Sequence, residues 1–232
     1  MNNTLWTFGD SMTFGHGCNE ECHSNFKEEY LLYKKEGDSI WPNHLGKLLN
    51  YKVNNLGKNG CSNDYIFGML IDNFNNIKEN DVVIINMTLH GRIDIPYKDK
   101  LYRSPASYEL VNLKRGQTYD NIKSMWIGGE FDDMDSEMVE TIINFQYYFS
   151  DNPYYKQQNI KRFEFLKERI IKEKNVKFCF LWGLEESSKI LYTFENIFKH
   201  TNGKIRDTHF SWNGHKEFSH YLHALIDKSK LI

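Results

Sequence analysis

The chain is organised around the segment Leu5–Gly15, which reads LWTFGDSMTFG. Residues 5–8 form an apolar run that predicts the first strand of a sheet. Ser11 then lies on the turn that leaves this strand, at the edge where α/β folds place their ligand crevices. Gly9 allows a sharp bend, and Gly15 leaves room for a substrate to approach the main chain. The segment therefore predicts either an ordinary Asp-Ser turn or a serine nucleophile at a strand end.

The composition is that of a globular domain. Hydrophobic residues make up 40% of the 232 residues and charged residues 26%, which argues against extensive disorder. The 29 Lys and Arg nearly balance the 31 Asp and Glu, so the charge gives no reason to expect a nucleic-acid or membrane partner. We expect a single domain over 1–232 and leave its oligomeric state open.

The sequence favours a cytoplasmic location. It contains no apolar segment long enough to span a membrane, and its first residues lack the basic region and apolar stretch of a secretory signal. The cysteines are too few and too unevenly spaced for a disulfide framework, which indicates a reduced compartment; they are Cys18, Cys22, Cys61 and Cys179. Cys179 falls in a predicted strand and is expected to fill apolar space. A virion-associated structural protein would share these features.

Predicted strands and helices alternate along the chain. Further strands are predicted at 51–56, 81–87 and 176–183, and the β-branched run at 81–87 is typical of a central strand covered on both faces. Helical periodicity predicts helices at 40–49, 64–77, 136–149, 154–174 and 212–228. This alternation predicts an α/β fold with an open, mostly parallel sheet.

Two stretches interrupt this alternation. Periodicity is lost between about 96 and 135, which is too long for a plain loop, so we expect an irregular insertion near the site. The stretch 194–207 is ambiguous, and a short edge strand is expected near 204–205. The sequence shows neither an internal repeat nor a convincing domain linker.

Groups that could activate a serine lie late in the sequence. A serine hydroxyl is a weak nucleophile until a base takes its proton, and the base needs an acceptor that orients it. Asp207 and His209 supply these two groups. An oxyanion also needs preorganised donors, each worth about 3 kcal/mol of barrier, and the turn that ends at Gly60 is one candidate. Ser11 and His209 are far apart in sequence, but this does not exclude a catalytic triad, because triads are defined by the spatial roles of their members.

These blocks resemble the SGNH/GDSL serine hydrolases. The resemblance rests on Gly9-Asp10-Ser11, on residues 55–60 (NLGKNG) and on the block from Asp207 to His215, which follow the family's order at strand-to-loop junctions. It implies a three-layer α/β/α flavodoxin-like fold with a mostly parallel central sheet, and ester hydrolysis through an acyl-enzyme without a cofactor. In this family Ser11 would attack, His209 would be base and then acid, and Asp207 would orient His209. The N–H groups of Ser11 and Gly60 would form part of the oxyanion hole.

The last block departs from the family pattern by one residue. The family usually has its aspartate three residues before the histidine, whereas Asp207 is two before His209 and Arg206 occupies the usual place. A change of one residue on an irregular loop can be absorbed, so we keep Asp207 as the predicted orienting carboxylate.

The third block departs further. The family normally shows Gly-x-Asn-Asp, whereas residues 85–92 here read INMTLHGR, so Thr88 or Asn86 would have to supply the side-chain donor of the oxyanion hole. This pattern of Thr and Arg looks like a divergent branch of the family met among bacteriophage proteins. In that branch Arg92 would bind substrate.

Other polar and aromatic residues allow further interpretations. His16, Cys18, Cys22 and His23 are suitable zinc ligands, but their spacing matches no strong signature, so we expect no metal site. His215 is expected to cap or pack against the final helix rather than react. Several aromatic residues could form a sugar-binding wall or belong to the core and its rim; they are Trp126, Tyr147, Tyr148, Tyr154 and Tyr155.

The sequence therefore predicts a serine esterase that cleaves a small acyl ester, such as an O-acetyl group on a carbohydrate. Its partner would be a small-molecule or glycan ester. The alternative is a catalytically inactive or repurposed domain that binds a carbohydrate or is a structural part of a phage particle. The altered third block and the shifted aspartate favour this alternative. A metal-dependent phosphoesterase is disfavoured because the carboxylates are not clustered.

Overall fold

The computed structural model describes residues 3–15, 40–103, 152–183, 210 and 212–229, together with residues 135, 137, 138, 141 and 144. Within these residues the main sheet has four parallel strands in the order β2-β1-β3-β6. They are β1 (Thr4–Gly9), β2 (Lys52–Gly57), β3 (Val82–Met87) and β6 (Phe178–Gly183). All four coincide with predicted strands, so the expected parallel sheet is confirmed.

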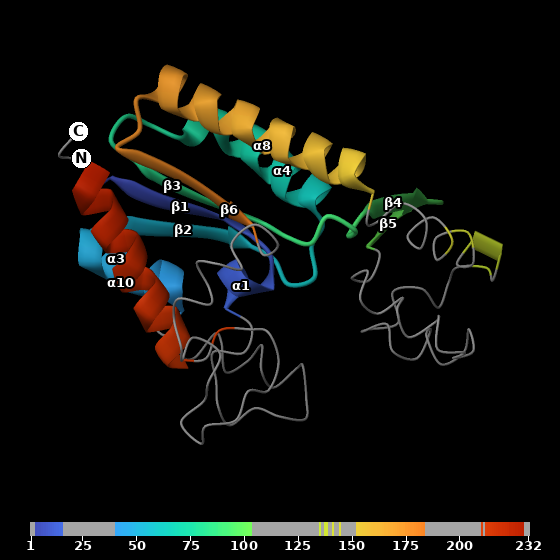
Figure 1. Ribbon diagram of the computed structural model, residues 1–232, viewed down its shortest axis with the longest axis horizontal. Coiled ribbons are helices and arrows are strands. Elements are labelled where there is room, and N and C mark those ends of the chain that lie inside the picture. Colours follow the sequence, from blue (N-terminus) through green and yellow to red (C-terminus); the bar gives the residue numbers. More distant parts are fainter. Residues whose placement is uncertain are drawn as a thin grey trace.

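Helices cover both faces of this sheet (Figure 1). On one face lie α3 (Trp41–Leu49) and α10 (Trp212–Ser229), and on the other lie α4 (Asn63–Asn73) and α8 (Pro153–Lys174). The short helix α1 (Ser11–Phe14) lies at the carboxyl end of the strands. The predicted three-layer α/β/α arrangement is confirmed.

The sheet has an apolar core on each side because strand side chains alternate between its faces. Leu5, Val82 and Ile84 pack with residues of α3 and α10. Phe8, Val83 and Ile85 belong to the second core cluster, with residues of α4 and α8. All six residues of β3 are buried, as the β-branched run predicts for a central strand.

The helices agree with the sequence except at one end. The helix predicted at 64–77 ends at Asn73, and the 3₁₀ helix η1 (Phe74–Asn76) follows it, so the last turn tightens rather than continuing as α-helix. Of the helix predicted at 136–149, residues 137, 138, 141 and 144 are described and are helical. None of the described helices is both long and apolar enough to cross a membrane.

The stretch predicted to be irregular from 96 begins with a hairpin instead. Strands β4 (Asp94–Tyr97) and β5 (Lys100–Arg103) pair antiparallel and lie beyond the carboxyl end of the parallel sheet (Figure 1). Strands of four residues are too short to be recognised from hydrophobic periodicity, and the presence of Pro96 disfavours the prediction of a strand. The two-stranded hairpin tolerates this proline, and Lys98 takes a left-handed conformation at the turn. Residues 104–134 and the stretch 194–207 lie outside the described residues.

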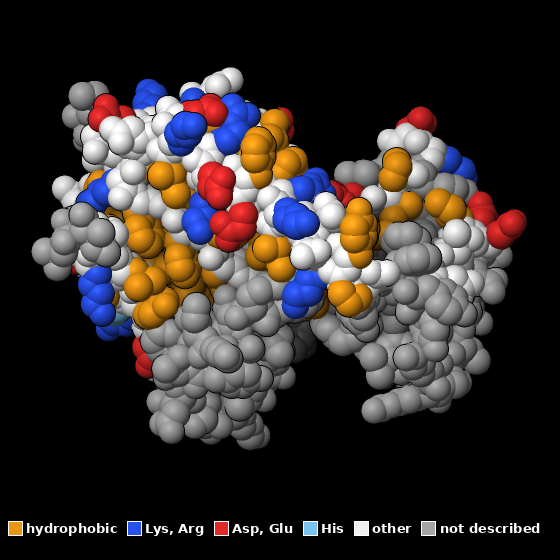
Figure 2. Space-filling view, turned by 45° about the horizontal axis from the view of Figure 1, so that its top comes forward, with side chains coloured by type: hydrophobic (Ala, Val, Ile, Leu, Met, Phe, Trp, Pro, Cys, Tyr) orange, Lys and Arg blue, Asp and Glu red, His pale blue; other side chains and the backbone are white. Residues whose placement is uncertain are grey.

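The outer face of α8 carries charges of both signs. They form neighbouring pairs along the helix, such as Lys167 with Glu164 and Arg169 with Glu173. Figure 2 shows blue and red side chains interspersed over this part of the molecule. Such exposed pairs contribute little to stability. We therefore attribute the packing of α8 against the sheet to its buried side chains, which include Phe163, Leu166 and Ile170.

We expect Gly9→Ala to lower the free energy of unfolding by about 1–3 kcal/mol, because added volume in a packed site forces neighbours apart. A Cβ at Gly9 would overlap Thr13 Oγ1 and lie 2.7 Å from Asn86 Cβ. Gly68→Ala is the matched control, since nothing lies within 4 Å of the added Cβ and the residue is inside α4. It should raise the free energy of unfolding by up to about 1 kcal/mol. Urea denaturation measures both, and similar effects of the two changes would contradict the close packing at Gly9.

Candidate active site

Strand ends bring the first three sequence blocks to one edge of the sheet. Gly9 is paired with Gly57 in register, and Met87 is paired with Gly183. In parallel strands these positions are all carboxyl ends, which is where α/β sheets bind ligands. Ser11 follows β1, and Gly60 lies on the loop after β2. Asn86 is the next-to-last residue of β3, and Thr88 and Arg92 lie on the loop that follows this strand.

Ser11 begins a single helical turn that is held from several sides. The Asp10 side chain caps this turn by accepting a hydrogen bond of 3.0 Å from the Met12 N–H. The turn ends at Gly15, whose φ of 103° favours glycine. Trp41 Nε1 donates to the Met12 carbonyl at 2.9 Å. The Ser11 residue is 4% exposed, so the turn presents it at the surface only narrowly.

The carboxylate of Asp10 is completely buried. Its Oδ1 also accepts a hydrogen bond of 2.8 Å from Asn86 Nδ2, and its Oδ2 lies 3.8 Å from Arg92 Nη1. The Arg92 side chain is 16% exposed. A buried charge is costly unless it is paired and hydrogen-bonded. Oδ1 accepts hydrogen bonds from Met12 and Asn86, whereas Oδ2 accepts none from the described residues and is compensated by the Arg92 charge.

Thr88 links the end of β3 to the start of α4. Its backbone N–H donates to Asn63 Oδ1 at 3.0 Å, and Asn63 Nδ2 donates back to the Thr88 carbonyl at 3.1 Å. The Thr88 hydroxyl accepts a hydrogen bond of 3.0 Å from Arg92 Nη1. The loops after β2 and β3 are therefore joined by a reciprocal pair of hydrogen bonds that sequence reasoning missed. Asn63 immediately precedes the helix predicted at 64–77 and received no role from the sequence.

The loop after β2 packs directly against the Ser11 turn. The Lys58 N–H donates to the Gly9 carbonyl at 2.9 Å, and Asn55 Nδ2 donates to the Thr13 carbonyl at 3.0 Å. A Cβ at Gly57 would lie 2.6 Å from the Phe14 backbone nitrogen, so a side chain there would push the turn away. Gly60 lies further along this loop, exposed and with a φ of 68°.

The structure thus brings together part of the predicted site. Ser11, Asn86, Thr88 and Arg92 lie around the Asp10 carboxylate, and Gly60 lies on the adjoining loop. The predicted base and its carboxylate, His209 and Asp207, lie outside the described residues. The same holds for the zinc ligand candidates, which are His16, Cys18, Cys22 and His23, and for Arg206 and the aromatic residues Trp126, Tyr147 and Tyr148.

The two candidate side-chain donors of the third block differ in what they can still donate. Asn86 Nδ2 is directed to Asp10 Oδ1 and, at 3.4 Å, to Thr13 Oγ1, and the residue is 0% exposed. An amide nitrogen has two hydrogens, and both therefore face protein groups. The Thr88 hydroxyl accepts from Arg92, which leaves its own hydrogen to be donated elsewhere.

His215, which the sequence predicts to cap or pack against the final helix, lies near the start of α10 with its side chain in the core. It is 0% exposed, and its ring lies edge-on to Phe210 with the ring centres 5.4 Å apart. Its Nδ1 accepts a hydrogen bond of 3.2 Å from the Trp41 N–H, which fixes the proton of a neutral ring on Nε2. His90 also belongs to the third block and received no role from the sequence. It is 1% exposed, and its Nδ1 lies 3.5 Å from Asn159 Nδ2 on α8.

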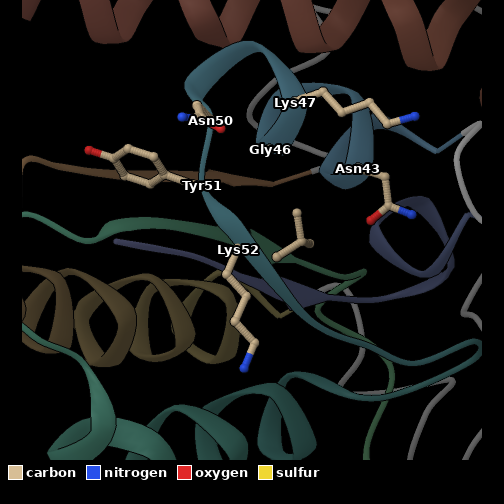
Figure 3. A pocket seen from close by; sticks show the side chains of 7 residues that line it. Asn43, Gly46, Lys47, Asn50, Tyr51 and Lys52 are labelled. Carbon is tan, nitrogen blue, oxygen red and sulfur yellow. The ribbon is translucent and has the colours of Figure 1, made fainter. Parts of the chain in front are cut away.

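Of two cavities lined by described residues, the one with the larger volume lies away from the Ser11 turn. It has a volume of about 490 Å³ and is lined by residues of α3 and of the amino end of β2 (Figure 3). Lys47 and Lys52 line it, but their amino groups point in different directions. The smaller, of about 280 Å³, lies between α3 and α10. Among the described residues, no three His, Cys, Asp or Glu side chains are grouped so that they could hold a metal ion.

Comparisons with known proteins found similarity only to solved structures. A protein from Desulfitobacterium hafniense, described as lipolytic and of the G-D-S-L family, is 15% identical with a TM-score of 0.37, and the match covers 97% of this chain and 99% of that one. A lipase/acylhydrolase from Enterococcus faecalis is 15% identical with a TM-score of 0.39 and covers 97% and 96%. A carbohydrate esterase is 10% identical with a TM-score of 0.41 and covers 97% and 68%. No family model and no curated protein matches the chain.

We expect Asn63→Ala to lower the free energy of unfolding by about 2–4 kcal/mol, because it leaves the buried Thr88 N–H and carbonyl without partners. Asn73→Ala is the control, since Asn73 makes one hydrogen bond to the Met69 carbonyl within its own helix. It should cost less than about 1 kcal/mol. Guanidinium denaturation compares the two variants. A loss for Asn63→Ala no larger than that of the control would mean that the link between the loops is not built as described.

We also expect Cys179 to resist alkylation in the folded protein. Burial raises the pKa of its thiol to about 12, so only about 1 in 10⁴ molecules carries the reactive thiolate at pH 8. Iodoacetamide treatment at pH 8 followed by peptide mass mapping should find Cys179 unmodified in buffer and modified in urea. Rapid modification in the folded protein would show that the thiol is accessible and ionised.

Proposed function

We propose that the protein is a serine hydrolase of the SGNH/GDSL type that cleaves a small acyl ester. The observation that carries this proposal is the position of Ser11, which begins a capped helical turn at the carboxyl end of β1, with the loops of β2 and β3 hydrogen-bonded around it. A nucleophile must be held in a fixed position relative to its donors, and this turn is held by Asp10, Trp41 and Asn55.

The proposed reaction proceeds through an acyl-enzyme. Ser11 Oγ attacks the ester carbonyl carbon while His209 takes the hydroxyl proton, and Asp207 holds the histidine ring in place. The tetrahedral intermediate then expels the alcohol, which takes the proton from His209. Water, deprotonated by the same histidine, attacks the acyl carbon. The second tetrahedral intermediate breaks its bond to Ser11 Oγ and releases the carboxylic acid, while His209 returns the proton to Ser11. Asp207 is one position closer to the histidine than in the family pattern. The proposal therefore requires that the Asp207 carboxylate still contacts the His209 ring.

The oxyanion of each intermediate would be bound by the N–H groups of Ser11 and Gly60 and by a side chain of the third block. We assign this last donor to Thr88 rather than Asn86, because the amide hydrogens of Asn86 face Asp10 and Thr13. The substrate class that we propose, an O-acetyl group on a carbohydrate, rests on analogy with the family alone.

A second candidate function is binding without catalysis. Two observations favour it: Ser11 is only 4% exposed, and both amide hydrogens of Asn86 face protein groups, Asp10 and Thr13. In this case the same edge would bind a carbohydrate, or the domain would be a structural component of a phage particle.

We expect Ser11→Ala to lower the rate of p-nitrophenyl acetate hydrolysis by at least about 10³-fold, because a triad loses its function when the nucleophile is removed. Ser229→Ala is the matched control, since Ser229 is exposed at the end of α10 and should leave the rate unchanged. Stoichiometric labelling of Ser11 by a fluorophosphonate would support the assignment independently.

Equal hydrolysis rates for the wild type and Ser11→Ala would remove the esterase proposal. The binding alternative is then tested with the Ser11→Ala protein on a glycan array. Retained recognition of a carbohydrate without turnover would favour it, and the absence of binding would leave neither function supported.

A further inference from the structure

The contacts of Arg92 are directed into the protein. One guanidinium nitrogen, Nη1, lies 3.0 Å from Thr88 Oγ1 and 3.8 Å from Asp10 Oδ2. The side chain is 16% exposed, so most of it is covered by the surrounding residues. The Nη1 nitrogen is therefore engaged by protein groups, as expected of a donor that positions neighbouring side chains.

The Asp10 carboxylate needs the charge of Arg92. It is 0% exposed, and the two groups that donate to its Oδ1, the Met12 N–H and the Asn86 amide, are both neutral. Removing one member of a buried ion pair leaves the other charge without compensation, and this is strongly destabilising. Loss of the Arg92 charge would therefore leave the buried Asp10 carboxylate without a charged partner.

Asp10 in turn fixes the position of Ser11. Its carboxylate caps the helical turn that begins at Ser11, and its carbonyl accepts hydrogen bonds from Thr13 and Phe14. A carboxylate that moves loosens this cap. Arg92 thereby acts on the nucleophile through one intervening residue.

Arg92 also orients the hydroxyl of Thr88. Because Nη1 donates to the Thr88 oxygen, the hydroxyl hydrogen must point away from the guanidinium. The proposed oxyanion donor is thus set by the same nitrogen that faces the buried carboxylate.

We infer that Arg92 is a positioning residue, which holds the Ser11 turn through Asp10 and directs the Thr88 hydroxyl, and that it does not contact the substrate. Its catalytic consequence rests on the function proposed above, whereas its effect on the turn does not. The family resemblance predicts a substrate-binding role for this residue. The two roles predict different effects of Arg92 variants on stability, hydrogen exchange, kcat and KM.

A double-mutant cycle separates them: Arg92→Met, Asp10→Asn, the double variant, and Arg92→Lys. Arg92→Met should lower the thermal midpoint by about 10 °C, because Asp10 is left as a buried unpaired charge. The double variant should recover at least half of this loss, since the introduced asparagine keeps the cap and carries no charge. Arg92→Lys should recover part of it, because the charge returns without the fork of donors.

Two further measurements report on the turn and on catalysis. Hydrogen exchange of the amides in residues 9–15 should be faster in Arg92→Met and should return toward the wild-type rate in the double variant. At a temperature where all variants are folded, Arg92→Met should lower kcat for p-nitrophenyl acetate by about 10–100-fold with KM unchanged.

Arg162 and Asp64 provide the matched control pair. Their side chains are 2.8 Å apart but 40% and 41% exposed, so Arg162→Met, Asp64→Asn and their combination should each shift the midpoint by less than about 2 °C. None of the three should change exchange in residues 9–15.

An Arg92→Met variant with an unchanged midpoint, unchanged exchange and a raised KM would overturn the inference and assign Arg92 to substrate binding. A lowered midpoint that the double variant does not recover would also overturn it. If the wild type neither hydrolyses ester nor labels at Ser11, the proposed function fails, and the midpoint and exchange cycle still decides whether Arg92 holds the turn.

Discussion

The Asp10 carboxylate is buried where β1, β2 and β3 end, and its burial constrains everything around it. A charge in this position must be compensated, and its partners come from different parts of the chain. The Met12 backbone and the Asn86 amide donate hydrogen bonds, and the Arg92 guanidinium forms an ion pair at 3.8 Å. Satisfying one carboxylate therefore fixes the Ser11 turn relative to β3 and to the loop that follows it. The sequence assigns Asp10 no role beyond its place in the Gly9-Asp10-Ser11 motif.

The close approach of these segments depends on residues that have no side chain. A Cβ at Gly9 would collide with Thr13 and Asn86, and one at Gly57 would press on the backbone of the Ser11 turn. The paired glycines at the ends of β1 and β2 thus let the turn lie directly on the sheet edge. The close approach allowed by the glycines and the hydrogen bonds of Asp10 depend on each other. If the turn lay further from the sheet, Asn86 would lose Asp10 as its hydrogen-bond acceptor.

The sheet and its covering helices follow from the sequence because their signal is local. β3 is a continuous β-branched run, and α3 and α10 have apolar residues at helical spacing, so burial and periodicity agree. The hairpin at Asp94–Arg103 escaped prediction because its strands are short and contain Pro96. The polar contacts of the site were not predictable from local patterns, since the partners of Asn63, Asn86 and Arg92 are set by tertiary structure. The prediction of Ser11 as nucleophile rests instead on the order of the sequence blocks along the chain.

Trp41 joins the Ser11 turn to the far end of the described chain. Its indole donates to the Met12 carbonyl, and its backbone N–H donates to His215 on α10. The ribosome delivers the Ser11 segment long before α10, so during synthesis the turn cannot make this full chain of contacts. The indole bond to Met12 can form once α3 has been made, whereas the bond to His215 is added only when α10 docks beside α3. In a nascent chain the support behind the turn is therefore completed last.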